Sequence, residues 1–374
     1  APMPAEPATV DDRSGPGENG AMQESSSSLR VSAGDLRRFV AEMFTTRDVP
    51  EEDAAIVADC LVTANLSGID THGVVRLAHY LRRLDNGTIN PAPNITFEQP
   101  ASSVLRVNGD NGLGHVIAKR GAEGALGICR EHGTVSVALG DSSHFGPASY
   151  FLLDAVRHGI AGMAVSHTDA IVVPHGAAKP FFGTNPIAFG FPAPEEPFML
   201  DISTSTIAYG RIELAKVEGK EIPAEWAVDA QGRPTTDPNK AVGMHPLAGH
   251  KGSGLALVVD VLSALLTGMP YGPHITRMYH EMDKPRHLGH FMVFWDIDRF
   301  VKLDVFKHRM GEMIDELHAL PPFEGFSRIY YPGEIEGERR AERQARGIPL
   351  EEGLFSELKE VARAVGVTAP SLEV

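Results

Sequence analysis

The pattern of apolar residues changes near residue 100, and this change constrains the fold more than any other feature. Before that point, apolar side chains recur every three or four positions, as in Leu36, Phe39, Val40 and Met43, which is the spacing of an amphipathic helix. Beyond it, short apolar runs alternate with helix-like segments, which is typical of layered α/β structures. The sequence therefore predicts an α/β fold that is preceded by helices.

Helix and strand signals place the expected elements along the chain. Ser32 followed by Asp35 has the pattern of a helix N-cap, a second helix is expected after Pro50, and a third from Thr71-His72 to the turn at Asn86-Gly87. Strands are expected over residues 103–107, 134–139, 160–166, 170–173, 187–191, 198–202 and 291–295. Helices are expected over residues 115–132, 147–158 and 252–266, the last buried on all sides, and over 301–320 and 351–365, after a charged link (EIEGERRAERQARG).

These elements divide the chain into four parts. Residues 1–29 are rich in Pro, Gly, Ser and acidic residues and are expected to form a disordered tail. Residues 30–100 form an N-terminal helical segment and residues 101–300 an α/β region. Residues 301–374 form a C-terminal helical segment, which we expect to pack with the N-terminal one.

Composition excludes several classes of protein. The formal net charge of −15 argues against a nucleic-acid binder, which needs a basic surface. No apolar run approaches the roughly 20 residues that span a bilayer, so no membrane partner is expected. Cys60 and Cys129 form no CxxC motif or paired framework, which indicates a reduced, cytoplasmic protein.

The segment GIDTHGVVRLAHYLRRL contains the first candidate site. His72, Arg76 and Tyr80 are four residues apart, so a helix would present them on one face. An Arg that binds a carboxylate through two nitrogens and a His that moves a proton suit a carboxylate substrate, and Thr71 can orient the imidazole. The alternative is a solvated helix face that carries incidental polar residues.

Two further segments place candidate residues at the ends of expected strands. His144 lies in DSSHFGPASYF, where a strand leads into a helix and where α/β sheets bind ligands; the alternative is an ordinary loop. Asp201 lies between Leu200 and Ile202 and needs a partner if it is buried. A His would be a natural partner, and the alternative is a carboxylate that caps nearby backbone.

The remaining motifs are weaker. Lys251 precedes an apolar helix in GHKG and can hold phosphate, but the segment is not a P-loop and no strand is followed by GxGxxG. The stretch MYHEMDKPRHLGH contains possible zinc ligands, yet it has no thiolate pair and no helical His pair. We therefore predict no metal site, and no GxSxG motif indicates an acyl-transfer enzyme.

Six strings in a fixed order resemble the malate/L-lactate dehydrogenase family of the non-Rossmann type. This family also contains ureidoglycolate, sulfolactate and piperideine-2-carboxylate oxidoreductases. The strings are GIDTHGVVR, DSSHFGPASYF, VVPHGAAKPFFGTNPIAFGFP, LDISTSTIAYGRI, GHKGSGLALVVDVLSALLTG and RIYYPGE, and the resemblance extends over about residues 30–350. The resemblance implies a non-Rossmann, mixed-sheet NAD(P)-binding domain, combined with a helical domain built from the N- and C-terminal segments.

The resemblance also implies roles for individual residues. His72 supplies the proton, Thr71 is its hydroxyl neighbour and Asp201 completes the relay, while Arg76 and Tyr80 lie on the substrate side. His144 matches a position at the nicotinamide and substrate, so the acid/base role stays open between His72 and His144. The implied cofactor contacts are His144, Thr168, Asp201, Ile202, Ser203, Lys251, Gly333, Glu334 and Ile335.

The expected activity is the NAD- or NADP-dependent interconversion of a small 2-hydroxy acid and its 2-oxo acid by a homodimer or larger oligomer. Segments such as IPAEWAVDAQGRPTTDP and GFSRIYYPGE also resemble ureidoglycolate dehydrogenases, and VVPHG and GHKG resemble cyclic imino-acid reductases. Two hypotheses of a different class stay open, namely a binding protein that has lost turnover and a metal-dependent hydrolase that uses His280 to His290.

Overall fold

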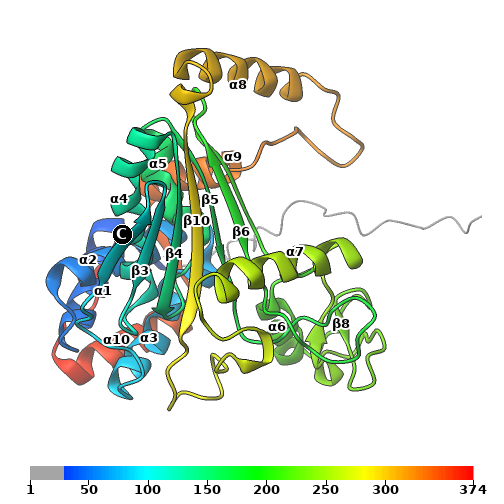
Figure 1. The fold of residues 1–374 in the computed structure, drawn as a ribbon. Coiled ribbons are helices and arrows are strands. Elements are labelled where there is room, and N and C mark those ends of the chain that lie inside the picture. Colours follow the sequence, from blue (N-terminus) through cyan, green and yellow to red (C-terminus); the bar gives the residue numbers. More distant parts are fainter. Residues whose placement is uncertain (1–28, 374) are drawn as a thin grey trace, which may run out of the picture.

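A seven-stranded mixed sheet forms the centre of the computed structural model, which describes residues 29–373 (Figure 1). The strand order is β2-β3-β4-β10-β5-β6-β7. Strands β3 and β4 pair in parallel and all other neighbours are antiparallel. The strands are β2 (Thr96–Ala101), β3 (Val104–Asn108), β4 (Thr134–Ser142), β5 (Ile160–Ser166), β6 (Ile187–Phe191), β7 (Phe198–Ile202) and β10 (Leu288–Asp296). The predicted α/β class and mixed sheet are confirmed.

Helices cover both faces of this sheet (Figure 1). Helix α4 (Gly114–His132), the 3-10 turn η3 (Ala148–Leu152) and α5 (Leu153–Arg157) pack on the face that buries Ala164 and Phe294. Helix α7 (His250–Asp260) packs on the other face, where Val259 contacts Val165 and Phe291. Because side chains alternate along a strand, Ala164 and Val165 of β5 contribute to separate cores.

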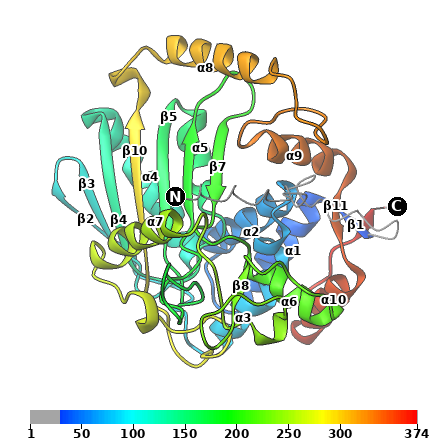
Figure 2. The same cartoon turned by 90° about the vertical axis from the view of Figure 1, so that its right-hand side faces the viewer.

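The two ends of the described chain meet in one helical unit. Helices α1 (Ala33–Thr45), α2 (Glu51–Leu66) and α3 (Leu77–Asp85) share a core with α10 (Glu352–Val365). A small sheet of order β11-β1-β12 joins β1 (Leu29–Val31) to β11 (Ile348–Leu350) and β12 (Leu372–Glu373). Figure 2 shows α1 and α10 side by side. The side chain of Ser32 caps α1 as expected, accepting a hydrogen bond from the backbone N–H of Asp35 at 3.0 Å.

Two peripheral parts complete the molecule. Helix α6 (Tyr209–Glu218), β8 (Ala227–Val228) and β9 (Gly243–Met244) form a lobe with its own small core. Helix α8 (Leu303–His318) has no buried residue and lies beyond the far end of the sheet (Figure 1). The division of the chain near residues 100 and 300 stays a prediction. The expected disordered tail lies outside the described residues, except for Leu29, which begins β1.

Several local expectations are wrong. Residues 170–173 form no strand, although Val172 makes isolated bridges to Phe182 and Met244. The charged link is helix α9 (Glu334–Arg346), because one face of it is anchored by Arg343, whose side chain is buried against α2. The helix expected over residues 147–158 begins as η3, and β2 was not anticipated because Pro100 interrupts its apolar pattern.

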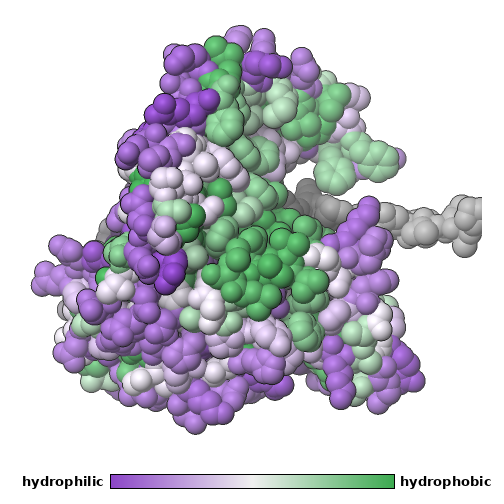
Figure 3. All heavy atoms as spheres, in the orientation of Figure 1, coloured by the Kyte–Doolittle hydropathy of each residue, from purple (hydrophilic) through white to green (hydrophobic). Residues whose placement is uncertain are grey.

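Helix α7 and its π-helical continuation η5 (Val261–Leu265) were expected to be buried on all sides, and they are not. One face packs on the sheet, but Leu257 and Leu265 are 51% and 58% exposed. Figure 3 shows an apolar patch over this helix. The patch, called here the α7 patch, consists of Leu255, Leu257, Val258, Val261, Leu265 and Leu266.

The shared core of the helical unit yields a stability prediction. Leu358 of α10 is 1% exposed and packs against the N-terminal helices. Leu358→Ala should therefore lower the free energy of unfolding by about 2–5 kcal/mol, through lost burial and a cavity. Urea unfolding followed by circular dichroism measures this change. Glu360→Ala, at an exposed position of the same helix, should change it by less than about 0.5 kcal/mol, and equal effects of the two variants would contradict the described packing.

Candidate active site

The carboxyl ends of three strands meet at one edge of the sheet. Strand β10 is antiparallel to both β4 and β5, and β7 is two antiparallel steps from β5, so β4, β5 and β7 run in the same direction. His144 follows β4, Thr168 follows β5 and Ser203 follows β7. Arg286 lies at this edge as well, because it shortly precedes β10, which runs in the opposite direction.

The segment that carries His72 is not one continuous helix, contrary to the sequence prediction. It forms the 3-10 turns η1 (Asp70–His72) and η2 (Val74–Arg76) before α3 begins at Leu77. Asn65 of α2 causes the break, because its side chain accepts a hydrogen bond from the N–H of Val74 at 2.8 Å and donates to Asp70 at 2.6 Å. Its amide also occupies the space beside Gly73, where a Cβ atom would lie 2.2 Å from the Asn65 side chain.

The structure nevertheless brings four of the expected residues together. The rings of His72 and His144 stack with their centroids 5.8 Å apart. The Tyr80 hydroxyl lies 2.6 Å from His144 Nδ1, and the Thr71 hydroxyl lies 3.0 Å from His72 Nδ1. Each imidazole is thus oriented through Nδ1 by a neighbouring hydroxyl. The cluster joins the helical unit to the loop after β4.

Burial keeps both imidazoles neutral. Desolvation, assisted by the nearby charge of Arg76, lowers the pKa of His72 to about 4. The same causes, with His72 itself, lower the pKa of His144 well below its usual value. Burial raises the pKa of Tyr80, so its hydroxyl keeps its proton. At neutral pH the cluster therefore contains proton-accepting imidazoles and a phenol that can donate a hydrogen bond.

Arg76 presents its guanidinium beside this cluster. Its Nε donates to the backbone carbonyl of Thr71 at 2.7 Å, and its guanidinium carbon lies 5.7 Å from the centre of the Tyr279 ring. Among residues 29–373, no carboxylate pairs with it. The arrangement leaves the two terminal nitrogens available to bind a carboxylate as a planar fork.

Asp201 is held differently from what the sequence predicted. Its carboxylate accepts a hydrogen bond from the backbone N–H of Ser149, in η3, at 2.8 Å, and no imidazole of the described chain contacts it. Burial raises the pKa of Asp201, and hydrogen bonds from Ser149 and from the backbone of Ala148 oppose this rise. The expected histidine partner is therefore wrong, and the alternative of a backbone cap describes its contacts. A role in cofactor binding stays a prediction.

Hydrogen bonds connect the segments that carry the expected cofactor contacts. The N–H of Thr184 donates to the Thr168 hydroxyl at 3.1 Å, and the N–H of Thr204 donates to the Thr184 carbonyl at 2.8 Å. The N–H of Leu247 in turn donates to the Thr204 carbonyl at 2.9 Å, shortly before α7 begins. On the outer side of β7, the N–H of Met199 donates to the Pro332 carbonyl at 2.9 Å, next to the start of α9.

The residues present fit a dinucleotide. Lys251 is exposed in the first turn of α7, where backbone N–H groups favour phosphate, and it makes no ion pair within the described part of the chain. Ile202 is 37% exposed at the end of edge strand β7 and offers an apolar surface. Gly183 lies so close to Thr168 that a Cβ atom at position 183 would be 2.0 Å from the Thr168 hydroxyl oxygen. Only glycine therefore fits beside Thr168 at this position.

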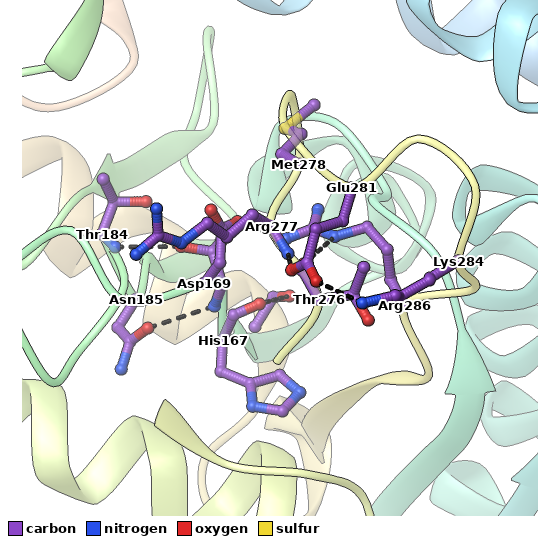
Figure 4. Close-up of polar contacts among 12 residues, drawn as sticks. His167, Asp169, Thr184, Asn185, Thr276, Arg277, Met278, Glu281, Lys284 and Arg286 are labelled. Carbon is purple, nitrogen blue, oxygen red and sulfur yellow. Dashed lines mark hydrogen bonds and ion pairs between the residues drawn. The ribbon is translucent and has the colours of Figure 1, made fainter. Parts of the chain in front are cut away.

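Sequence reasoning missed several buried residues around the cluster. The rings of His115 and Tyr80 meet edge to face at 4.8 Å, and neither nitrogen of His115 has a partner among the described residues. Arg286 pairs with Asp169 and accounts for much of the polar network drawn in Figure 4. The only available signal for Arg286 was its place in the histidine-rich stretch considered for zinc. There the other side chains are dispersed: His287 pairs with Asp141, and His290 lies between Ser142 and Ser166.

Buried neutral histidines should make the protein sensitive to acid. Burial lowers the pKa of His115, His167 and His290 to about 3 each, against about 6.5 in an unfolded chain. Between these values the unfolded chain binds more protons, so the free energy of unfolding falls as the pH is lowered. Each residue should cost about 2 kcal/mol at pH 5.

Urea unfolding at pH 7.5, 6 and 5 tests this dependence. His115→Leu should flatten it by the contribution of one histidine, whereas His308→Leu, at an exposed position, should leave it unchanged. A free energy of unfolding that is constant between pH 7.5 and 5 would contradict the assignment of neutral buried imidazoles.

Comparison with known proteins agrees with this fold. A family model described as malate/L-lactate dehydrogenase matches residues 31–359. A ureidoglycolate dehydrogenase (NAD(+)) of Escherichia coli O157:H7 is 34% identical over 333 residues, which are 88% of this chain and 95% of the relative. A malate dehydrogenase of Pyrococcus horikoshii is 34% identical over 349 residues, which are 91% and 96% of the two chains.

A solved structure shows the same architecture. The crystal structure of malate dehydrogenase from Entamoeba histolytica superposes with a TM-score of 0.87 at 30% sequence identity, covering 92% of this chain and all (100%) of that one. The resemblance seen in the six sequence strings is thereby confirmed, and the chain belongs to the malate/L-lactate dehydrogenase family.

Proposed function

We propose that the protein is an NAD(P)-dependent oxidoreductase that interconverts a small 2-hydroxy acid and its 2-oxo acid. The observation that supports this most strongly is the cluster of His72, His144 and Tyr80 beside the unpaired fork of Arg76. Family membership supports the same activity. The small-molecule partner is thus a carboxylate, and the cofactor is NAD or NADP.

In the proposed reaction, the residues of this cluster have different roles. The nicotinamide, when bound, accepts or supplies the hydride. Arg76 binds the carboxylate of the substrate and so places its second carbon. One of the two imidazoles removes the hydroxyl proton during dehydrogenation and returns it to the oxygen during reduction. Because the low pKa of both rings keeps them unprotonated, either ring is ready to act as a base at neutral pH.

The cofactor is assigned to segments at the carboxyl ends of the strands and beside β7. Thr168 lies just after β5, and Asp201, Ile202 and Ser203 lie at the end of β7. Gly333, Glu334 and Ile335 lie where α9 begins, beside the start of β7. Lys251 would hold phosphate. The partly buried position of the histidines strengthens the electrostatic interactions that position a bound anion.

Substrate identity is the finer part of this proposal. Malate or lactate is the general expectation, while a ureidoglycolate and a cyclic imino acid are the alternatives. A panel of malate, lactate, ureidoglycolate, 2-oxo acids and cyclic imino acids, read by the absorbance of NADH and NADPH, distinguishes them. Absence of turnover with every member of the panel would instead favour a binding protein.

We further propose that the protein is a cytoplasmic homodimer or larger homo-oligomer. The α7 patch supports association, because contiguous exposed apolar surfaces of this kind mark interfaces. Cys60 and Cys129 are both unpaired and buried, which agrees with a reducing compartment. Within the described residues, no helix has the length and apolar character needed to cross a membrane.

Histidine variants test the catalytic assignment. His72→Ala and His144→Ala should each be assayed for hydride transfer in a single turnover with saturating cofactor and substrate. The variant that lacks the acid/base should be slower by about 10²–10⁴-fold, and the other should be affected less. His308→Ala is the control, because this imidazole is exposed on α8. If neither His72→Ala nor His144→Ala slows hydride transfer, the site assignment is wrong.

Charge placed in the α7 patch tests the oligomer. Leu257→Glu combined with Leu265→Glu should shift the molar mass, measured by light scattering after size exclusion, toward that of the monomer. The charges would be desolvated in an apolar interface. Val217→Glu, which replaces an 87% exposed apolar residue on α6, should leave the mass unchanged. A double variant with the molar mass of the wild type would show that the α7 patch is not the interface.

A further inference from the structure

Within the described residues, one nitrogen of Arg286 has no partner, although its side chain is only 2% exposed. Its Nε donates to the backbone carbonyl of Thr276 at 3.1 Å, and its Nη2 forms an ion pair with Asp169. Figure 4 shows the arginine between the segment after β5 and the loop before β10. The remaining nitrogen, Nη1, is buried and has no hydrogen-bond partner among residues 29–373.

A buried guanidinium N–H group that has no hydrogen-bond acceptor lowers the stability of the protein. Burial of an arginine is tolerated when its N–H groups are all paired, and a group left without a partner carries its full desolvation cost. The two contacts of Arg286 neutralise its charge and fix its plane, but they do not satisfy Nη1. A ligand atom that accepts a hydrogen bond from Nη1 would remove this cost.

A second buried arginine, Arg83, anchors the same loop and serves as a comparison for Arg286. It is 1% exposed and holds the same loop by donating to the backbone carbonyls of Lys284, Arg277 and Met278. Its Nε donates to His79, so every nitrogen of this guanidinium has a partner. Anchoring of the loop therefore does not require the orphan nitrogen of Arg286.

The loop held by these arginines lies against the candidate active site. Tyr279, within it, meets the ring of His79 at 5.3 Å and lies 5.7 Å from the guanidinium carbon of Arg76. At its other end, Arg286 pairs with Asp169, which directly follows Thr168, one of the expected cofactor contacts. The loop thus runs from the Arg76 side of the cluster to its cofactor side, where Arg286 lies.

Electrostatics agree with this placement. After burial, the charges that lower the pKa of His144 include both Arg76 and Arg286. Both arginines also oppose the rise that burial causes in the pKa of Tyr80. Two separate cations therefore act on the same histidine–tyrosine pair.

We propose that Arg286 determines substrate specificity by binding the second polar end of a 2-hydroxy acid through Nη1, while Arg76 binds the carboxylate next to the reacting carbon. The second end is an oxygen acceptor such as a carboxylate, a sulfonate or a carbamoyl oxygen. Asp169 is a positioning residue that holds the plane of the guanidinium. This inference rests on the proposed dehydrogenase function.

Kinetics of Arg286→Lys with one-ended and two-ended substrates test the proposal. Lysine keeps the positive charge but loses the planar fork. The ratio of kcat/KM for malate to kcat/KM for lactate should fall by about 10- to 100-fold, the value of a hydrogen bond to a charged group, beyond any loss that the weaker loop anchoring causes for both acids. Residual turnover of lactate shows that the variant is folded.

Arg83→Lys is the matched control. It weakens the anchoring of the same loop without touching Nη1, so it should lower both kcat/KM values in proportion and leave their ratio unchanged. An Arg286→Lys protein that behaves in the same proportional way would overturn the proposal, because Arg286 would then act only as an anchor. A wild-type protein that prefers lactate to malate, sulfolactate and ureidoglycolate alike would also overturn it.

Calorimetric titration separates this inference from the proposed function. Malate and lactate are titrated into the wild type and Arg286→Lys in the presence of NAD or NADP. If the wild type turns over no member of the substrate panel but binds malate about 10-fold or more tightly than Arg286→Lys does, the dehydrogenase assignment fails and the role of Arg286 stands. If the wild type turns over both acids and the variant binds malate equally well, the function stands and this inference fails. If the wild type neither binds nor turns over any member of the panel, both fail.

Discussion

The position of β10 between β4 and β5 is the constraint on which the rest of the structure depends. This strand arrives late in the sequence and pairs with both neighbours in antiparallel fashion. Its insertion makes β4 and β5 run in the same direction one strand apart, so the loops that carry His144 and Thr168 leave the sheet at one edge. It also delivers the loop that ends at Arg286 to that edge. A parallel β10 would have taken Arg286 to the opposite end of the sheet.

The second organising feature is the burial of charge and polarity in an acidic protein. Its net charge is −15, yet the groups that surround His72 and His144 are cations or neutral rings. Arg76 and Arg286 create a local positive field, and burial prevents the histidines from adding to it. In the proposed reaction, different groups therefore bind the anion and move the proton, because the arginines keep their charge while the imidazoles stay neutral.

Much of the fold and part of the site could be predicted from the sequence. Strands β6 and β7 begin and end at the expected residues, because each is a short apolar run bounded by turn residues, which is a strand signal. The grouping of His72, His144 and Tyr80 followed from motifs. The break at Gly73 did not, since it depends on the amide of Asn65, and neither did the histidine-free environment of Asp201.

Arg286 illustrates the limit of such prediction. Its neighbours Asp169 and Thr276 are 117 and 10 residues away, and nothing local distinguishes a buried arginine from a surface one. The exposure of the α7 patch was unpredictable for a related reason. A high content of apolar residues shows that a helix favours burial, but it does not show whether its apolar faces are covered by the same chain or by a second copy.

The contact between Arg343 and Asp70 has a consequence for biosynthesis. Arg343 donates to the Asp70 carboxylate and to the Asn65 carbonyl, across a separation of 273 residues in the first case, and it supports the turn that presents His72. The last strand of the small terminal sheet is added at residues 372–373. During synthesis the sheet region can therefore become compact early, whereas the turn of His72 gains this support only after Arg343 has been added to the chain.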